Sequence, residues 1–377
     1  MTASRIYLDH NATTPVSAAA RAAVTEALDL LGNPSSVHRP GAAARQVVER
    51  AREQVAAMVG AQPAEIVFTS GGTEANNCVL QGIDRHIIVS AVEHDSVLAA
   101  AAQRAPHGAT TVPVDAAGVI DLGALQQTLN TNEGALLSLM LANNETGVVQ
   151  PVREAAAMAH AAGAMVHCDA VQGPGKIPVD MAALGVDLLT LSAHKFGGPM
   201  GVGALVVRTR VVLSPSQVGG GQEGYRRAGT QNVPGIAGFG AAAAGSSDAA
   251  ADASRIAALR DRLEAACAQC GAEVMGAGAP RLPNTSCLTM PGISSETQIM
   301  ALDLDGIAVS AGAACSSGKV GPSHVLAAMG VAPDLAATAI RVSLGRTTTE
   351  ADVARFISAW SALYQRKHGA ATTRRAS

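Results

Sequence analysis

The chain has 377 residues, which is long enough for two domains of ordinary size, each with its own core. Hydrophobic residues make up 48% of the chain but aromatic residues only 2%, so we expect a core of aliphatic side chains and alanine. A net charge of −3 gives no electrostatic basis for binding nucleic acid or an anionic membrane, and we expect neither as a partner.

The sequence also indicates where the protein works. No apolar run reaches the length of a membrane-spanning helix, and the N-terminal residues lack the apolar region of a signal peptide. The six cysteines are scattered, which argues against a disulfide framework and favours a reducing compartment. We therefore expect a soluble, unprocessed enzyme of the cytoplasm.

The first part of the chain predicts short alternating elements. Residues 6–9 predict a strand that runs into a polar turn, and Ser17 is then placed to cap a helix that reaches about Leu31. The run GNPSS at 32–36 is too rich in helix breakers to be anything but a loop. Residues 42–59 predict a charged helix that ends at the following glycine.

A strand predicted at 65–69 leads into the glycine turn SGGTEA, which opens the next helix. The N-terminus of a helix presents free N–H groups and the positive end of its dipole, so a phosphate could rest on Gly72 and Thr73. The same residues also make a good helix cap, and at this point both interpretations stay open.

Two further strands lead into polar groups. A strand at 86–90 places His94 just beyond its end, where this ring is suited to stack on a cofactor because aromatic residues are scarce. A hydrogen-bonded loop histidine is the plainer alternative. A strand at 136–141 leads to NNETG at 143–147, whose amides suit a cofactor or substrate oxygen but are equally explained by turn formation.

The strongest chemical signal lies in the middle of the chain. Residues 164–167 and 187–191 predict buried parallel strands, and Asp169 and Lys195 follow their C-terminal ends. In open α/β sheets that edge is where ligands bind. We therefore expect these two side chains to share one site.

Lysine is scarce, with only four in the chain, so a lysine kept beside His194 points to an amine that must lose its proton, which arginine cannot do. A lysine that forms a Schiff base, together with an aspartate that pairs with a pyridinium nitrogen, is what pyridoxal phosphate requires. A capping Asp169 and a surface Lys195 would have the same spacing, so the rest of the chain must decide.

The chain continues with a strand predicted at 204–207 and a glycine-rich loop at 219–234. The arginines of that loop and Thr230 could reach an anion in a neighbouring subunit. The Ala/Gly/Ser-rich tract 238–253 is expected to begin a long helix that joins two domains, and we place the boundary near residue 250.

Two features of the second domain carry chemistry. Residues 310–318 predict a flexible loop of small residues around Cys315, with nothing to bury the sulfur, which favours a reactive thiol. Residues 339–344 alternate like a half-buried strand, with Arg341 facing away from the flanking apolar residues. The planar fork of Arg341 suits a substrate carboxylate, although an arginine on the strand's surface is an equally good interpretation.

The remaining cysteines predict no site. Cys267 and Cys270 have a C-x-x-C spacing on a helix expected at 254–270, but no partner pair is near in sequence, so we expect no zinc or other metal. The basic tail after Tyr364 is expected to fray. Three cysteines lie in apolar contexts and are expected in the core: Cys78, Cys168 and Cys287.

Ten segments now stand in order along the chain: YLDHNATTP, GNPSSVH, FTSGGTEANN, EHDSV, NNETGVVQP, HCDAVQ, SAHKFGGPMGVG, GGGQEGYRRAGT, VSAGAACSSGKVGPSHVL and IRVSLGR. Together they resemble the class I cysteine desulfurases (NifS/IscS-like) of the class V aminotransferase superfamily, over essentially the whole chain.

The resemblance implies an α/β protein of the pyridoxal phosphate-dependent transferase fold type I. Its large domain would hold a mixed, mostly parallel seven-stranded sheet between helices and span residues 16–250. A smaller α+β domain, built from 1–15 and 251–377, would carry the loop of the catalytic cysteine.

The resemblance also implies roles for individual residues. Lys195 would hold pyridoxal 5′-phosphate and later move the α-proton of the substrate, and Asp169 would pair with the pyridinium nitrogen. Gln172 would donate to the ring hydroxyl oxygen, and His94 would stack on the ring and relay protons. Cofactor contacts would also come from Asn144, and phosphate contacts from Gly72, Thr73, Ser192, His194 and, in the other subunit of a homodimer, Thr230.

For the substrate, the resemblance implies that Asn144 and Arg341 hold the carboxylate, with Asn33 as a weaker candidate, and that Cys315 is the nucleophile. L-Cysteine would give L-alanine and a persulfide on Cys315. The sulfur would pass to an acceptor protein, either an iron-sulfur scaffold or a sulfur carrier for a thio-cofactor. The C-terminus lacks the long extension with which housekeeping members engage their scaffold, which leaves the acceptor open.

Alternatives of the same superfamily are a selenocysteine lyase and an aminotransferase, neither of which calls for this cysteine loop. A non-catalytic protein with a degenerate fold would have lost Lys195, Asp169 or Cys315, and all three are present. Departures from the family pattern occur where other members often have different residues, and none removes a catalytic group: His10, Ala193 and Met200.

Overall fold

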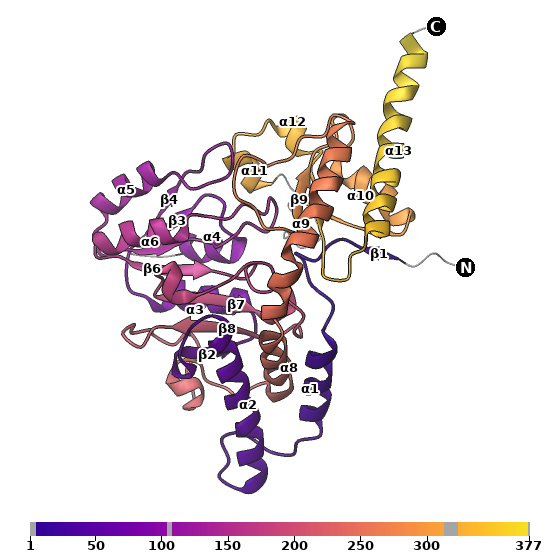
Figure 1. The fold of residues 1–377 in the computed structure, drawn as a ribbon. Coiled ribbons are helices and arrows are strands. Elements are labelled where there is room, and N and C mark those ends of the chain that lie inside the picture. The colour runs from indigo at the N-terminus through magenta and orange to yellow at the C-terminus, as the bar shows by residue number, and fades with distance from the viewer. Residues whose placement is uncertain (1–4, 104–107, 313–322, 376–377) are drawn as a thin grey trace.

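The computed structural model describes residues 5–103, 108–312 and 323–375, and Cys315 lies outside these ranges. Figure 1 shows a large sheet flanked by helices and, beside it, a second group of elements formed mainly by the C-terminal part of the chain. Below, these are called the large-sheet lobe and the C-terminal lobe.

The large sheet has seven strands, and only β8 runs antiparallel to its neighbours. Every residue of the inner strands except the first of β6 is buried, which explains their mostly apolar sequences. In spatial order the strands are β2 (Ile66–Thr69), β8 (Gly203–Val207), β7 (Leu188–Ser192), β6 (Met165–Asp169), β5 (Leu136–Ser138), β3 (Ile87–Ser90) and β4 (Ala109–Val112).

Helices cover both faces of this sheet because successive residues of a strand point to opposite sides. In β2, Ile66 and Phe68 belong to the buried cluster that also contains residues of α2, α5, α6 and α8, whereas Val67 belongs to the cluster that contains residues of α3 and α4. The helices of this lobe are α1 (Ala18–Leu28), α2 (Arg39–Met58), α3 (Gly72–Gly82), α4 (Asp95–Ala102), α5 (Leu122–Thr131), α6 (Val152–Ala161), α7 (Met181–Leu184) and α8 (Val233–Ala244).

The C-terminal lobe contains two small sheets. Strands β11 (Ser310–Ala311), β12 (Ile340–Ser343) and β9 (Thr285–Leu288) form an antiparallel sheet in that order, and β1 (Ile6–Tyr7) pairs with β10 (Ile307–Ala308) in parallel. The N-terminal strand therefore belongs to the C-terminal lobe.

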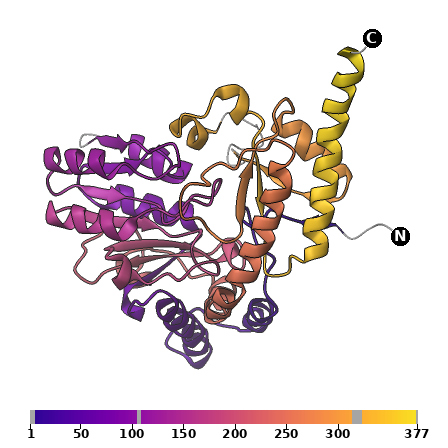
Figure 2. The ribbon, with the colours of Figure 1, turned by 45° about the horizontal axis from the view of Figure 1, so that its top comes forward.

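Several of its helices contribute to a core that contains Phe356 and Trp360. Figure 2 shows the yellow α13 beside the orange α9 on the outer side of this lobe. The helices are α9 (Ser247–Ala268), α10 (Ser295–Leu304), α11 (His324–Ala328), α12 (Pro333–Ala336) and α13 (Glu350–Arg375). Within the described residues no helix is both long and apolar enough to cross a membrane.

Most predicted elements are present, with ends shifted by a few residues. Ser17 caps α1 as predicted, because its side chain accepts a hydrogen bond from the backbone N–H of Ala20. The three cysteines expected in the core are buried, which confirms that prediction.

The tract 238–253 contains the end of α8 and, after Gly245 and Ser246, the start of the 22-residue helix α9, so a long helix does begin in this tract as expected. One expectation was wrong. The tail after Tyr364 does not fray at that residue, because α13 continues to Arg375 through a run with few helix breakers.

Candidate active site

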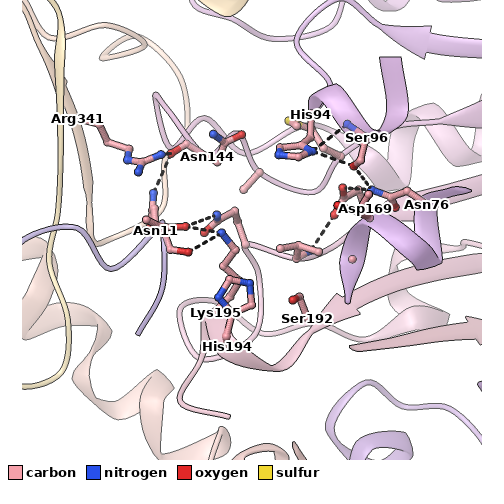
Figure 3. Close-up of a pocket in the computed structure, with 17 residues that line it drawn as sticks. Asn11, Asn76, His94, Ser96, Asn144, Asp169, Ser192, His194, Lys195 and Arg341 are labelled. Carbon is pink, nitrogen blue, oxygen red and sulfur yellow. Dashed lines mark hydrogen bonds between the residues drawn. The ribbon is translucent and has the colours of Figure 1, made fainter. Parts of the chain in front are cut away.

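A cavity of about 310 Å³ lies at the carboxyl ends of the parallel strands, where the two lobes meet (Figure 3). The chain segments that follow β2, β3, β5, β6 and β7 reach it from the large sheet, and residues after β1 and in β12 close the other side. Its lining residues are Asn11, Ala12, Gly72, Thr73, Asn76, His94, Ser96, Met140, Ala142, Asn144, Asp169, Val171, Gln172, Ser192, His194, Lys195 and Arg341.

Ten residues predicted for the site line this one cavity: Gly72, Thr73, His94, Asn144, Asp169, Gln172, Ser192, His194, Lys195 and Arg341. Asn33 and Thr230 do not line it and are exposed. The side chain of Asn33 instead accepts a hydrogen bond from the N–H of Ser35 at 2.9 Å. The predicted nucleophile, Cys315, lies outside the described residues.

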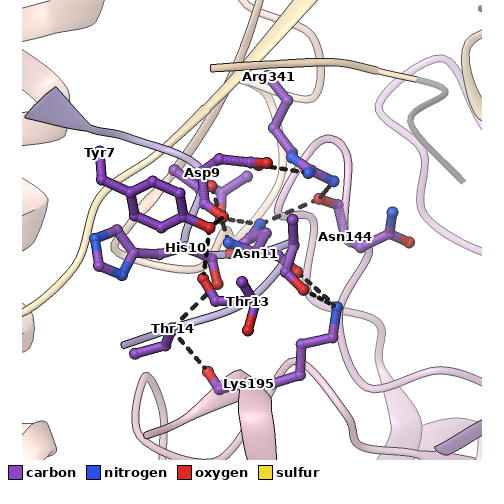
Figure 4. Close-up of polar contacts among 12 residues, drawn as sticks. Tyr7, Asp9, His10, Asn11, Thr13, Thr14, Asn144, Lys195 and Arg341 are labelled. Atoms are coloured by element: carbon purple, nitrogen blue, oxygen red, sulfur yellow. Dashed lines mark hydrogen bonds and ion pairs between the residues drawn. The ribbon is translucent and has the colours of Figure 1, made fainter. Parts of the chain in front are cut away.

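Lys195 ends a short 3-10 helix (Ala193–Lys195) that directly follows β7. Its amine donates to the backbone oxygens of Asn11 at 2.7 Å and Ala12 at 3.0 Å (Figure 4). The polar turn after β1 therefore holds the lysine amine at the wall of the cavity.

Asp169 is the last residue of β6 and is buried. Its Oδ2 accepts from Asn76 Nδ2 at 2.7 Å, and its Oδ1 accepts from the N–H of Val171 at 3.0 Å. The two donors therefore hold the Asp169 carboxyl group at the wall of the cavity.

His94 is both a cap and a cavity residue. It lies at the N-cap of α4, and its Nδ1 accepts from the N–H of Ser96 at 3.1 Å. The two interpretations left open by the sequence, a ring for a cofactor and a hydrogen-bonded loop histidine, are therefore compatible in one residue.

Another part of the cavity lining, at the N-terminus of α3 and the end of β7, consists of groups that suit an anion. Gly72 begins α3, and a Cβ on it would lie 2.8 Å from a methyl group of Val171, so the helix approaches the wall closely only because this residue is glycine. Thr73 and Ser192 add hydroxyl groups. Burial, and then the charges of Lys195 and Lys176, lower the pKa of His194 to about 4, which keeps its ring neutral.

Arg341 differs from the expectation for an exposed surface arginine, because it is only 2% exposed. The strand β12 is the middle strand of its sheet, and all four of its residues are buried. The guanidinium donates to Asp9 Oδ1 at 2.7 Å and to the backbone oxygen of Asn144 at 3.2 Å. It therefore reaches the cavity as a fixed group.

Sequence reasoning missed Asn11 and Lys176. The side-chain oxygen of Asn11 accepts from Lys176 Nζ at 3.0 Å and from Asn284 Nδ2 at 3.1 Å, which links the two lobes. Burial, together with the charges of Lys195 and Arg341, holds the pKa of Lys176 well below its usual range. The scarcity of lysine, which singled out Lys195, applied equally to Lys176.

These residues fit pyridoxal phosphate. The cavity has the size of a small-molecule site, with an amine on one wall, a carboxylate on another and a helix N-terminus with hydroxyl groups at one end. The carboxyl group of Asp169 suits the nitrogen of a pyridine ring, and the lysine amine suits the carbonyl group of the cofactor.

A lysine and an aspartate, which here lie at the carboxyl edge of a mixed seven-stranded sheet, are the pair with which pyridoxal phosphate-dependent enzymes hold their cofactor. Residues 6–356 match the family model described as Aminotransferase class-V. The chain belongs to this family, whose members depend on pyridoxal phosphate.

Relatives make the comparison more specific. Cysteine desulfurase 2 of Trichormus variabilis is 44% identical over 361 residues, covering 93% of this chain and 90% of that protein. A NifS-like protein of Rickettsia africae superimposes with a TM-score of 0.89 at 36% identity, over 96% of this chain and 99% of that one. The structure titled SspA in complex with cysteine has a TM-score of 0.78 at 30% identity, over 90% and 98% of the two chains. The predicted fold class and the resemblance to cysteine desulfurases are confirmed.

Proposed function

We propose that this protein is a cysteine desulfurase, which removes the sulfur of L-cysteine, releases L-alanine and leaves a persulfide on Cys315. The observation that carries the proposal is the cavity that gathers Lys195, Asp169, His94 and Arg341. The relatives named cysteine desulfurase support the same reaction.

The group we expect in the cavity is pyridoxal 5′-phosphate, which when bound supplies a carbonyl carbon for the substrate amine and a ring that accepts electron density. Lys195 and Asp169 would hold its two ends, and Gln172 would donate to the ring oxygen. Contacts to its phosphate would come from Gly72, Thr73, Ser192, His194 and, in a second copy of the chain, Thr230.

The remaining roles belong to the chain's own groups. Arg341 and Asn144 would bind the substrate carboxylate, and the amine of Lys195 would take the proton from the substrate α-carbon. The Cys315 thiolate would then attack the substrate sulfur. A sulfur–sulfur bond forms as the bond between the substrate sulfur and its β-carbon breaks, and the electron pair of that bond stays with the substrate. Lys195 would return the proton to the α-carbon, and the β-carbon would take a proton, equivalent to the one lost by the Cys315 thiol, to become the methyl group of alanine.

The test compares the purified protein with Cys315→Ala, measuring alanine and sulfide released from L-cysteine with a thiol reductant. Absorbance at about 400 nm reports the bound cofactor independently. We expect the variant to keep that absorbance and make no alanine, while Cys270→Ala, a partly exposed control cysteine, stays active. Full turnover by Cys315→Ala would overturn the persulfide mechanism in favour of a lyase or an aminotransferase.

We infer a homodimer as the working form, since Thr230 is exposed and does not line the cavity of its own chain. Exposed apolar side chains on the segments before α2 and after β8 support this inference: Leu31, Val37, Val212, Val218 and Tyr225. Light scattering of the purified protein would test the oligomeric state.

We expect the sulfur to pass to an iron-sulfur scaffold or a sulfur-carrier protein in the cytoplasm. Persulfide chemistry needs reduced thiols, which that compartment maintains. Cell fractionation would test the location, and transfer of labelled sulfur to candidate acceptors would identify the partner.

A further inference from the structure

A continuous line of hydrogen bonds connects the Asp169 carboxylate with the His94 ring (Figure 3). Asn76 Nδ2 lies 2.7 Å from Asp169 Oδ2 and 2.9 Å from Ser96 Oγ. Ser96 Oγ in turn lies 2.8 Å from His94 Nδ1. All four side chains line the cavity, but only Asp169 and His94 were predicted for the site from the sequence.

The donors in this line are determined by chemistry. An amide NH₂ carries two hydrogens, so Asn76 Nδ2 donates to both Asp169 and Ser96. With the amide reversed, Asn76 Oδ1 would face the Asp169 carboxylate at hydrogen-bond distance with no proton between them, which is unfavourable. The carboxylate therefore fixes the orientation of the amide.

The hydroxyl of Ser96 accepts from Asn76 and keeps its own hydrogen to donate. The acceptor is His94 Nδ1 at 2.8 Å, which also accepts from the backbone N–H of Ser96 at 3.1 Å. Two donors directed at one ring nitrogen leave no place for a proton on it. The proton of the neutral ring must therefore be on Nε2.

We propose that Asn76 and Ser96 are positioning residues for His94, which they hold as the neutral ring with its hydrogen on Nε2 while linking it to the charge of Asp169. The expected effect of this positioning on turnover rests on the proposed desulfurase function. In this form His94 offers Nε2–H as a hydrogen-bond donor, while its Nδ1 is already used as an acceptor. The ring can therefore donate to a hydrogen-bond acceptor in the cavity, and it cannot take up a proton until the contacts of Nδ1 break.

The ring itself can be examined in the apoprotein by NMR with ¹⁵N-labelled histidine, using His94→Gln to assign the signal. We expect a single neutral form of His94 with the hydrogen on Nε2. A signal from a ring with its hydrogen on Nδ1, or from a doubly protonated ring, would overturn the proposal. This measurement does not depend on the folding of a Ser96 variant or on cofactor binding.

Variants test whether the arrangement matters in the reaction. Ser96→Ala removes one of the two donors to His94 Nδ1 and leaves the backbone N–H in place, and it should lower kcat about 3- to 10-fold, as expected for one lost hydrogen bond, with KM changed by less than about twofold. Ser96→Thr, which keeps the hydroxyl, should restore kcat. Asn76→Ala should resemble Ser96→Ala, whereas Asn130→Ala, an exposed asparagine of α5, should change neither.

An unchanged kcat in a folded Ser96→Ala protein would overturn the positioning role even if the NMR spectrum is as expected. Failure of the wild-type protein to make alanine would instead count against the proposed function. The ring form in the apoprotein would still be measured, so the two failures are distinguishable.

Discussion

Arg341 and Asp9 form an ion pair with 2.7 Å between Nη2 and Oδ1. This pair joins β12 to the segment that follows β1, beside the cavity. Arg341 is almost fully buried, and its other contact is the backbone oxygen of Asn144. The pair holds the planar guanidinium in place before any substrate arrives. Such a fixed fork suits the two oxygens of a carboxylate.

Arg341→Lys tests this arrangement. A lysine keeps the charge but loses the fork, so we expect kcat/KM for L-cysteine to fall about 10- to 100-fold, mainly through KM. The absorbance change caused by L-cysteinamide, which lacks the carboxylate, should be nearly the same in variant and wild type. Arg346→Lys, at an exposed arginine paired with Asp252, is the control. A uniform loss for both ligands would contradict carboxylate recognition by Arg341.

Glu145 introduces a dependence of stability on pH. Burial raises its pKa to about 7, although Ser323 Oγ donates to its carboxylate at 2.6 Å. The ordinary value is 4.5, so between these pH values the folded chain holds a proton that the unfolded chain has lost. The free energy of unfolding therefore falls as pH rises from 4.5 to about 7, by about 3 kcal/mol in total.

Glu145→Gln removes this titration and retains an oxygen for Ser323. We expect the variant to be more stable than wild type above pH 7 and less sensitive to pH below it, measured by urea unfolding at a series of pH values. Glu154→Gln on the surface of α6 should leave the wild-type profile intact. Parallel profiles for wild type and Glu145→Gln would show that Glu145 does not cause the slope.

Arg52 and Glu223 form a bidentate pair in the interior of the large-sheet lobe, at 2.8 and 3.0 Å. The N–H of Phe68 also donates to Glu223. Burial alone would raise the pKa of Glu223, but the hydrogen bonds and charge of Arg52 outweigh it and hold the pKa below its usual range. Each side chain therefore neutralises the buried charge of the other.

Arg52→Met should therefore destabilise the protein by about 3–5 kcal/mol, because it leaves the Glu223 carboxylate buried without its cation. The double variant Arg52→Met/Glu223→Met should lose less than the sum of the single variants, as determined by urea unfolding. Strictly additive losses would mean that the two side chains stabilise the protein independently.

The sequence was sufficient for the main strands and for the central pair of site residues. Residues 164–167 and 187–191 are mostly apolar runs, as is typical of strands buried on both faces, and the scarcity of lysine marked Lys195. Because parallel strands end at one edge, Asp169 and Lys195 could be placed together before their distances were known.

Other parts of the site could not be predicted from local patterns. Asn11 contacts Asn284 and Thr285 from the opposite end of the chain, and no spacing rule predicts such a contact. The alternation around Arg341 suggested one exposed face, but the sequence does not show that the N-terminal segment covers it. Nothing in the local sequence around Ser96 shows that Asn76, 20 residues earlier, donates to its hydroxyl group.

His10 and Gly345 form a contact that admits no side chain on the glycine. A Cβ at Gly345 would lie 2.0 Å from Cε1 of the buried His10 ring. Gly345 does not have a positive φ, so crowding by the ring, and not backbone conformation, is what requires glycine. The Tyr7 ring, edge-on to His10 at 5.1 Å between centroids, restricts how far the imidazole can move.

Gly345→Ala should therefore lower the free energy of unfolding by about 1–3 kcal/mol, the range found for overpacked interiors. In a His10→Ala background the same substitution should cost much less, which a double-mutant cycle of urea unfolding would measure. Gly278→Ala, where the nearest atom to an added Cβ is 3.9 Å away, should be close to neutral. If Gly345→Ala were equally destabilising with and without the imidazole, the glycine would be required for a reason other than contact with His10.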